Sequence, residues 1–276
     1  MKDAIARTIT YLAIALLALL WLVPVLSTIL VAFKTPHDFV SQKFYEPPST
    51  FGLIVNLRNA MEQYQIQGHV LSSLMYSAAG ASVAILCAAM AGYSIVRLKP
   101  RFAFALFLVI YSGTIFPFQM YLIPVYKLYN AIGLYDTRLG MILVYSAICI
   151  PFALFVYRGF YTTIPREVEE AAKLDGCGPL RMLFRIFIPN SKAPTAVVAL
   201  FQATWIWNDL LFGMVLTRKE TIRPVMVAVA SMMGFGGTSI PLLMAVVLAV
   251  SIPTIALFVF LRRYFISGMV MAKADS

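Results

Sequence analysis

The chain has 276 residues, of which 61% are hydrophobic and only 12% are charged, and its formal net charge is +10. Ordinary soluble domains have about 45–50% apolar and about 25% charged residues, so this composition excludes a soluble globular protein. The basic surplus does not indicate a nucleic-acid partner, because in a membrane chain the positions of Lys and Arg carry more information than their sum.

Six apolar runs are each long enough to cross a hydrocarbon core about 30 Å thick as a helix of about 20 residues. The first run is longer than a signal-peptide core and no cleavage pattern follows it before Lys34, so we expect it to be retained. The sequence predicts an all-α fold, a polytopic helical bundle forming one membrane domain over residues 1–276. The predicted transmembrane helices cover residues 9–33, 70–96, 102–126, 139–157, 193–217 and 241–261.

The basic residues predict the orientation of this bundle. With the N-terminus inside, 14 of the 22 Lys and Arg residues fall on one side of the membrane and 8 on the other. Cytoplasmic loops carry the basic excess, so we expect both termini in the cytoplasm. The segment from Lys34 to about His69 is then the longest outer loop. Its two histidines, His37 and His69, are expected to be ordinary solvated loop residues.

The chain has few groups that could supply energy or catalysis. Asp209 is the one clearly ionisable residue inside the six predicted helices, and a single carboxylate does not make a proton relay. No lysine follows a glycine, so the phosphate-binding P-loop pattern is missing. Nucleophile and metalloprotease motifs are missing as well. The three cysteines (Cys87, Cys149 and Cys177) have no paired spacing, so we expect no disulfide, no metal site and no enzyme activity.

The longest cytoplasmic loop covers residues 158–192 and predicts two short helices. The first has Pro165 in its first turn and acidic residues at its start, and Gly176 ends it. The second runs from about Pro179 to Phe187, and Pro189 is expected to end it. Such an amphipathic pair can lie on the membrane surface or dock in the groove of a partner protein, and the residue pattern alone leaves both possibilities open.

The spacing within this loop resembles the EAA signature of permease subunits of bacterial binding-protein-dependent ABC importers. Glu170, Ala171 and Ala172 are followed after three residues by Gly176, and Ile186–Pro189 come nine residues later. Other segments resemble the sugar-type branch, which includes maltose and glycerol-phosphate importers. These segments are Ala91–Arg97, Ile123–Tyr135, Phe152–Gly176, Phe201–Phe212 and Arg263–Gly268.

The resemblance implies a role for the first short helix as the coupling helix, seated in a cleft of a separate ATPase subunit. The residues expected to couple this chain to the ATPase are Glu170, Ala171, Ala172, Asp175, Gly176 and Pro189. The implied partners are an ATPase dimer that binds ATP and Mg, a second and unlike permease subunit, an extracytoplasmic solute-binding protein and the lipid of a bacterial cytoplasmic (inner) membrane. No cofactor is expected in this chain itself.

The fifth predicted helix is the best candidate for lining the substrate path. At about 100° per residue, its polar and aromatic residues fall on one half, which we expect to face the bundle. The path candidates are Gln202, Trp205, Asn208 and Asp209. The alternative is that Asn208 and Asp209 only join helices by hydrogen bonds. A secondary transporter and an intramembrane enzyme are rival functions, and the sequence does not select among sugars, oligosaccharides, polyols and glycerophosphate-like substrates.

Overall fold

The computed structural model describes the backbone of residues 2–234 and 238–274 and the side chains of residues 6–233 and 238–264. Within these ranges the chain is helical and contains no β-strand, which confirms the predicted all-α membrane fold. Four helices in the described part are long and apolar enough to cross a membrane, and they correspond to the first, second, fourth and sixth predicted helices. They are Ala6–Ala32, Ile66–Leu98, Arg138–Thr163 and Ile240–Tyr264.

The third and fifth predicted helices are interrupted. The third consists of α5 (Ala103–Ser112) and α6 (Gln119–Ala131), and the connection contains Pro117, which has no N–H to donate to a helix. The fifth consists of α11 (Lys192–Trp207) and α12 (Leu211–Leu216). The full set of six transmembrane helices therefore stays a prediction.

The chain divides into two compact units. The first unit comprises residues 1–67 and 228–252. It contains α1 (Lys2–Ala32), α2 (Pro36–Ser41), α3 (Leu53–Tyr64), most of α13 (Val225–Gly234) and the first part of α14 (Ile240–Ala274).

Buried polar side chains organise the connection after α1. The amide of Asn56 donates to the carbonyl oxygens of Ala32 at 3.1 Å and Lys34 at 2.9 Å. The carboxylate of Asp38 accepts from the Ser49 hydroxyl at 2.5 Å, and this hydrogen bond lowers the pKa of Asp38. The predicted outer loop therefore has a defined structure, including two short helices that the sequence did not predict.

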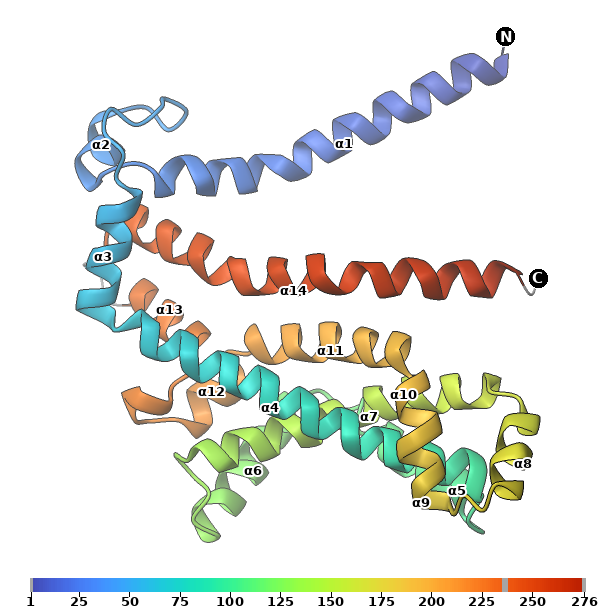
Figure 1. The fold of residues 1–276 in the computed structure, drawn as a ribbon. Coiled ribbons are helices and arrows are strands. Elements are labelled where there is room, and N and C mark those ends of the chain that lie inside the picture. The colour runs from blue at the N-terminus through green and yellow to red at the C-terminus, as the bar shows by residue number, and fades with distance from the viewer. Residues whose placement is uncertain (1, 235–237, 275–276) are drawn as a thin grey trace. The chain divides into compact units, whose positions relative to one another are not determined.

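The second unit comprises residues 68–227 and 253–276, and α7 (Arg138–Thr163) is its central helix. α7 packs against α5, α11 and the π-helical turn η1 (Ser94–Leu98), which follows α4 (Ile66–Tyr93). Two buried clusters form its core, one around Tyr157 and Phe187 and the other around Tyr145 and Phe212. Figure 1 shows α8 (Arg166–Leu174) and α9 (Pro179–Met182) at one end of this unit and α6 toward the other.

The second short helix is longer than predicted. α9 continues through a π-helical turn, η2 (Leu183–Phe187), into α10 (Ile188–Asn190), so Pro189 lies inside the last turn rather than after the helix. Proline has no N–H to donate, so a helix tolerates proline best where that N–H would make no helical hydrogen bond. Pro189 follows the wider π-turn η2, where the regular α-helical hydrogen-bond pattern is already interrupted. The prediction that Pro189 ends the helix was therefore wrong by one residue.

Candidate functional site

α8 begins one residue later than predicted and otherwise has the ends that its sequence predicts. Pro165 occupies the N-cap position, Glu167 and Glu169 lie in the first turn, and Lys173 lies in the last turn. Gly176 adopts a φ of +73°, in the left-handed region that glycine occupies at little cost. A Cβ atom added to Gly176 would meet nothing within 4 Å. Glycine is therefore favoured here by the backbone conformation and not by a lack of space for a side chain.

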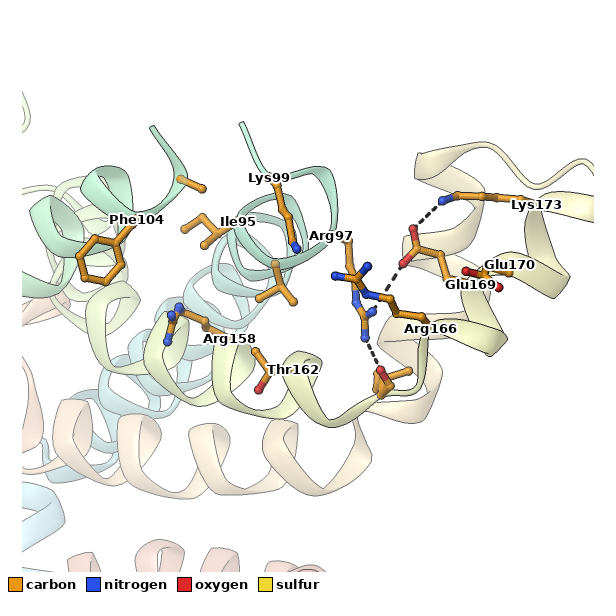
Figure 2. A pocket seen from close by; sticks show the side chains of 13 residues that line it. Ile95, Arg97, Lys99, Phe104, Arg158, Thr162, Arg166, Glu169, Glu170 and Lys173 are labelled. Carbon is orange, nitrogen blue, oxygen red and sulfur yellow. Dashed lines mark hydrogen bonds and ion pairs between the residues drawn. The ribbon is translucent and has the colours of Figure 1, made fainter. Parts of the chain in front are cut away.

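Arg97 joins α8 to the ends of two long helices. Its Nη2 donates to the carbonyl oxygens of Tyr161 at 2.7 Å and Ile164 at 2.5 Å, where α7 ends. Its Nη1 lies 3.5 Å from the carboxylate of Glu169, and Lys173 Nζ lies 2.9 Å from the other oxygen of that carboxylate (Figure 2). The Arg97 side chain is only 6% exposed, so this is a largely desolvated anchor between α4, α7 and α8.

Phe187 connects the second short helix to the same anchor. The guanidinium of Arg97 lies 5.2 Å from the centre of the Phe187 ring. The rings of Tyr93 and Tyr161 meet Phe187 edge-on, with centroids 4.8 Å and 5.2 Å away. Phe187, Tyr93 and Tyr161 are all buried, so the second short helix packs tightly against the ends of α4 and α7.

The structure divides the predicted coupling residues by exposure. Ala172 is buried against the unit, whereas Glu170, Ala171, Asp175 and Gly176 are exposed. The Leu174 side chain beside them is 90% exposed. Sequence reasoning did not single out the pair Arg97 and Glu169. Two signals could have found it: the four-residue spacing of Glu169 and Lys173, and an arginine at the end of an apolar run.

The break in the fifth predicted helix borders a cavity of about 780 Å³. Of the four predicted path residues, Trp205, Asn208 and Asp209 line this cavity and Gln202 does not. The cavity wall is otherwise mainly apolar and aromatic. Its further lining residues are Phe118, Leu200, Phe201, Thr204, Leu210, Leu211, Phe212, Thr254 and Phe258.

Asp209 holds the helix break in place. Its carboxylate accepts hydrogen bonds from the Tyr145 hydroxyl at 2.9 Å and from the backbone N–H of Gly213 at 3.1 Å, in the first turns of α12. The residue is 8% exposed. Asn208 is exposed, and its amide donates within its own helix to the Thr204 carbonyl at 2.8 Å. These contacts fit the helix-joining alternative for Asp209, while Asn208 joins no second helix through this bond.

His69 is not the solvated loop residue that the sequence predicted. It lies in the first turn of α4 and is 3% exposed. Its Nδ1 is 2.9 Å from the Arg223 carbonyl oxygen, and its Nε2 is 3.4 Å from the Glu220 carboxylate. The prediction failed because the helix begins four residues earlier than the apolar run, which turns His69 toward the segment around η3 (Glu220–Ile222). His37, in contrast, is exposed as expected.

Known proteins similar to this chain are membrane components of transporters. A probable ABC transporter permease of Pyrococcus horikoshii is 38% identical over 179 residues, which are 64% of this chain and 65% of that protein. The melibiose/raffinose/stachyose import permease MelC of Bacillus subtilis is 28% identical and covers 95% of this chain and 94% of its own length. The glucose import system permease GlcU of Saccharolobus solfataricus is 29% identical, with 98% and 95% covered.

A solved structure shares the fold. A chain of a bacterial ABC transporter involved in alginate import superimposes with a TM-score of 0.85 at 21% identity, covering 96% of this chain and 98% of that chain. In addition, the family model described as the inner membrane component of binding-protein-dependent transport systems matches residues 51–270. Such components translocate a solute and are not enzymes. This chain therefore belongs to the family of binding-protein-dependent transport system inner membrane components.

Proposed function

We propose that this chain is one permease subunit of an ATP-driven importer for a carbohydrate or a related polyol. It forms half of the translocation path, pairs with an unlike permease subunit and receives substrate from an extracytoplasmic solute-binding protein. A separate ATPase dimer binds ATP and Mg. The near-full-length similarity to two permeases named for sugar import supports the substrate class.

The two faces of α8 carry the coupling part of this proposal. The inner face is fixed to the transmembrane helices through Ala172 and the pair of Arg97 and Glu169. The outer face presents Glu170, Asp175 and the nearly fully exposed Leu174. An isolated chain gains nothing from exposing a leucine beside carboxylates, whereas a partner with an apolar groove and basic groups would bind both.

Rigid-body motion is the expected mechanism. When the ATPase subunits close on ATP, the coupling helix of each permease moves with them. In this chain the motion would reach α4 and α7 through Arg97, which faces Glu169 of α8 and also donates to two carbonyl oxygens at the end of α7. The two permease subunits then rock against each other and open the path toward the outside.

Substitutions at α8 test this coupling. Glu170→Lys and Gly176→Asp should leave the protein inserted in the membrane but abolish uptake and transport-stimulated ATP hydrolysis in the reconstituted complex. Glu62→Lys makes the same charge change on an exposed helix in the predicted outer loop, and it should leave the amount of co-purified ATPase unchanged. Uptake near the wild-type rate in either α8 variant would refute the assignment.

The cavity at the helix break supports a path for a polar, ring-containing substrate. Trp205 offers an aromatic face beside Phe118 and Asn208 offers an exposed amide, a combination that suits sugar hydroxyls and apolar ring faces. Alanine at Trp205 or Asn208 should change the apparent affinity for substrate while ATPase assembly stays normal. Gln202 does not line the cavity, so its place in the path rests on the sequence pattern and Gln202→Ala tests it separately. Unchanged uptake kinetics in the Trp205 and Asn208 variants would leave these two residues a purely structural role.

A further inference from the structure

A cleft of about 630 Å³ lies where η1, the start of α5, the end of α7 and α8 meet. Cations outnumber carboxylates among its lining side chains by five to two (Figure 2). The cationic residues are Arg97, Lys99, Arg158, Arg166 and Lys173, and the carboxylates are Glu169 and Glu170.

Part of this charge is balanced inside the cleft. Glu169 accepts from Lys173 and lies against Arg97, so these three groups serve the α8 anchor. The other cations, Lys99, Arg158 and Arg166, have no carboxylate within ion-pair distance among the side chains that the structure describes. The guanidinium of Arg158 lies 4.4 Å from the centre of the Phe107 ring, a contact that uses none of its N–H donors.

The same cleft has an apolar wall. Val96 and Ala103 line it, and the Phe104 side chain is 64% exposed. The cleft also lies at the ends of apolar helices, since two helices able to cross the membrane end at Leu98 and Thr163. The ends of membrane-crossing helices lie toward the level at which phospholipid head groups meet acyl chains, so a lipid at the membrane surface can reach such a cleft.

We propose that this cleft binds an anionic phospholipid. The phosphodiester contacts Lys99, Arg158 and Arg166, and the start of an acyl chain lies along Phe104. A free anion would leave the apolar wall unused, and an uncharged amphiphile would leave the cations unpaired, so an anionic lipid matches both surfaces. A bound head group would bridge Lys99 after η1 and Arg166 at the start of α8.

Native mass spectrometry on the delipidated, purified complex tests this site. The complex is titrated with phosphatidylglycerol, with phosphatidylcholine and with phosphatidylglycerol in the presence of inorganic phosphate. The double variant Lys99→Gln/Arg166→Gln should bind phosphatidylglycerol roughly 25-fold more weakly, at about 5-fold for each removed cation. The control Arg7→Gln/Arg262→Gln loses the same charge at positions that do not line the cleft and should bind like the wild type.

Four results would overturn the proposal. Equal losses in both double variants would mean that only the general basic surface attracts lipid. Equal retention of phosphatidylcholine would mean that the cations make no contact, and full displacement by inorganic phosphate would mean that the site takes the free anion. Phe104→Ala keeps every charge, and it should weaken binding of long-chain but not of short-chain phosphatidylglycerol. An unchanged preference for the long-chain lipid would also refute the site.

Discussion

In the second unit, two helix ends are each hydrogen-bonded by a buried ionisable side chain, and the two side chains are of opposite charge type. At the end of α7, buried Arg97 donates to two carbonyl oxygens that the helix leaves without partners. At the start of α12, buried Asp209 accepts from the N–H of Gly213. In each case the side-chain charge has the sign that the helix dipole favours at that end.

The two places differ in what lies beside the buried charge. Asp209 also accepts a hydrogen bond from the Tyr145 hydroxyl, so its hydrogen-bond partners all lie within the second unit. Arg97 continues to Glu169 on α8, and the next residue, Glu170, is exposed. A buried charge is therefore evidence of a helix end being satisfied, and the exposed charge next to it is the better candidate for contact with a partner.

Removing the Asp209 carboxylate should have the largest effect on stability. Asp209→Ala leaves the N–H of Gly213 and the hydroxyl of Tyr145 without their acceptor, which should lower the free energy of unfolding by about 3 kcal/mol. Thermal unfolding of the purified protein in detergent measures this change. Asn208→Ala, which removes only a bond within its own helix, should change stability by less than about 0.5 kcal/mol. Similar losses in both variants would contradict the structural role of Asp209.

Substitution of Arg97 should destabilise α8 even when the positive charge is kept. In Arg97 one guanidinium nitrogen donates to both carbonyl oxygens and a second nitrogen faces Glu169, so the single ammonium nitrogen of Arg97→Lys cannot hold both positions. We expect a local loss of about 2 kcal/mol, seen as faster hydrogen exchange at the amides of α8. Arg181→Lys, at an exposed position of α9, is the matched control. If α8 stayed equally protected in both variants, Arg97 would not be its anchor.

The sequence predicted the ends of α8 because proline, acidic residues and glycine each act locally there. It also predicted the fold class, since long apolar runs have few structural solutions. It did not predict the break between α11 and α12, because whether Asp209 caps a new helix depends on Tyr145, which is 64 residues away in the chain. The burial of His69 depends on Arg223 and Glu220, which are even more distant in sequence.

Gly176 gives a smaller test of the exposed side of α8. Gly176→Ala should cost about 1 kcal/mol, because the φ of +73° disfavours any Cβ although no neighbour is in the way. Gly178→Ala has equal space and a φ of −69°, so it should be close to neutral. Thermal unfolding of both variants side by side separates backbone strain from the general effect of adding a methyl group. Equal stabilities would mean that the loop can relax at Gly176.

Asp136 shows how much a carboxylate that binds backbone N–H groups contributes to stability where water competes for the same hydrogen bonds. It lies outside the transmembrane helices, and its carboxylate accepts from the backbone N–H groups of Arg218 at 2.7 Å and Lys219 at 2.9 Å. Desolvation alone would raise the pKa of Asp136, but these hydrogen bonds and the Lys219 ammonium outweigh it and lower the pKa.

A lowered folded-state pKa means that the stabilisation is present at neutral pH and is lost as the pH falls through that pKa. Asp136→Asn should therefore cost about 0.5 kcal/mol at pH of about 7, and the difference from the wild type should shrink as the pH falls below about 4 and through the lowered pKa of Asp136. Unfolding midpoints of both proteins across this pH range give the measurement. A difference that stayed constant with pH would mean that Asp136 acts through its shape rather than its charge. Stabilisation of the backbone by a charged side chain would then be limited to the buried helix ends at Arg97 and Asp209.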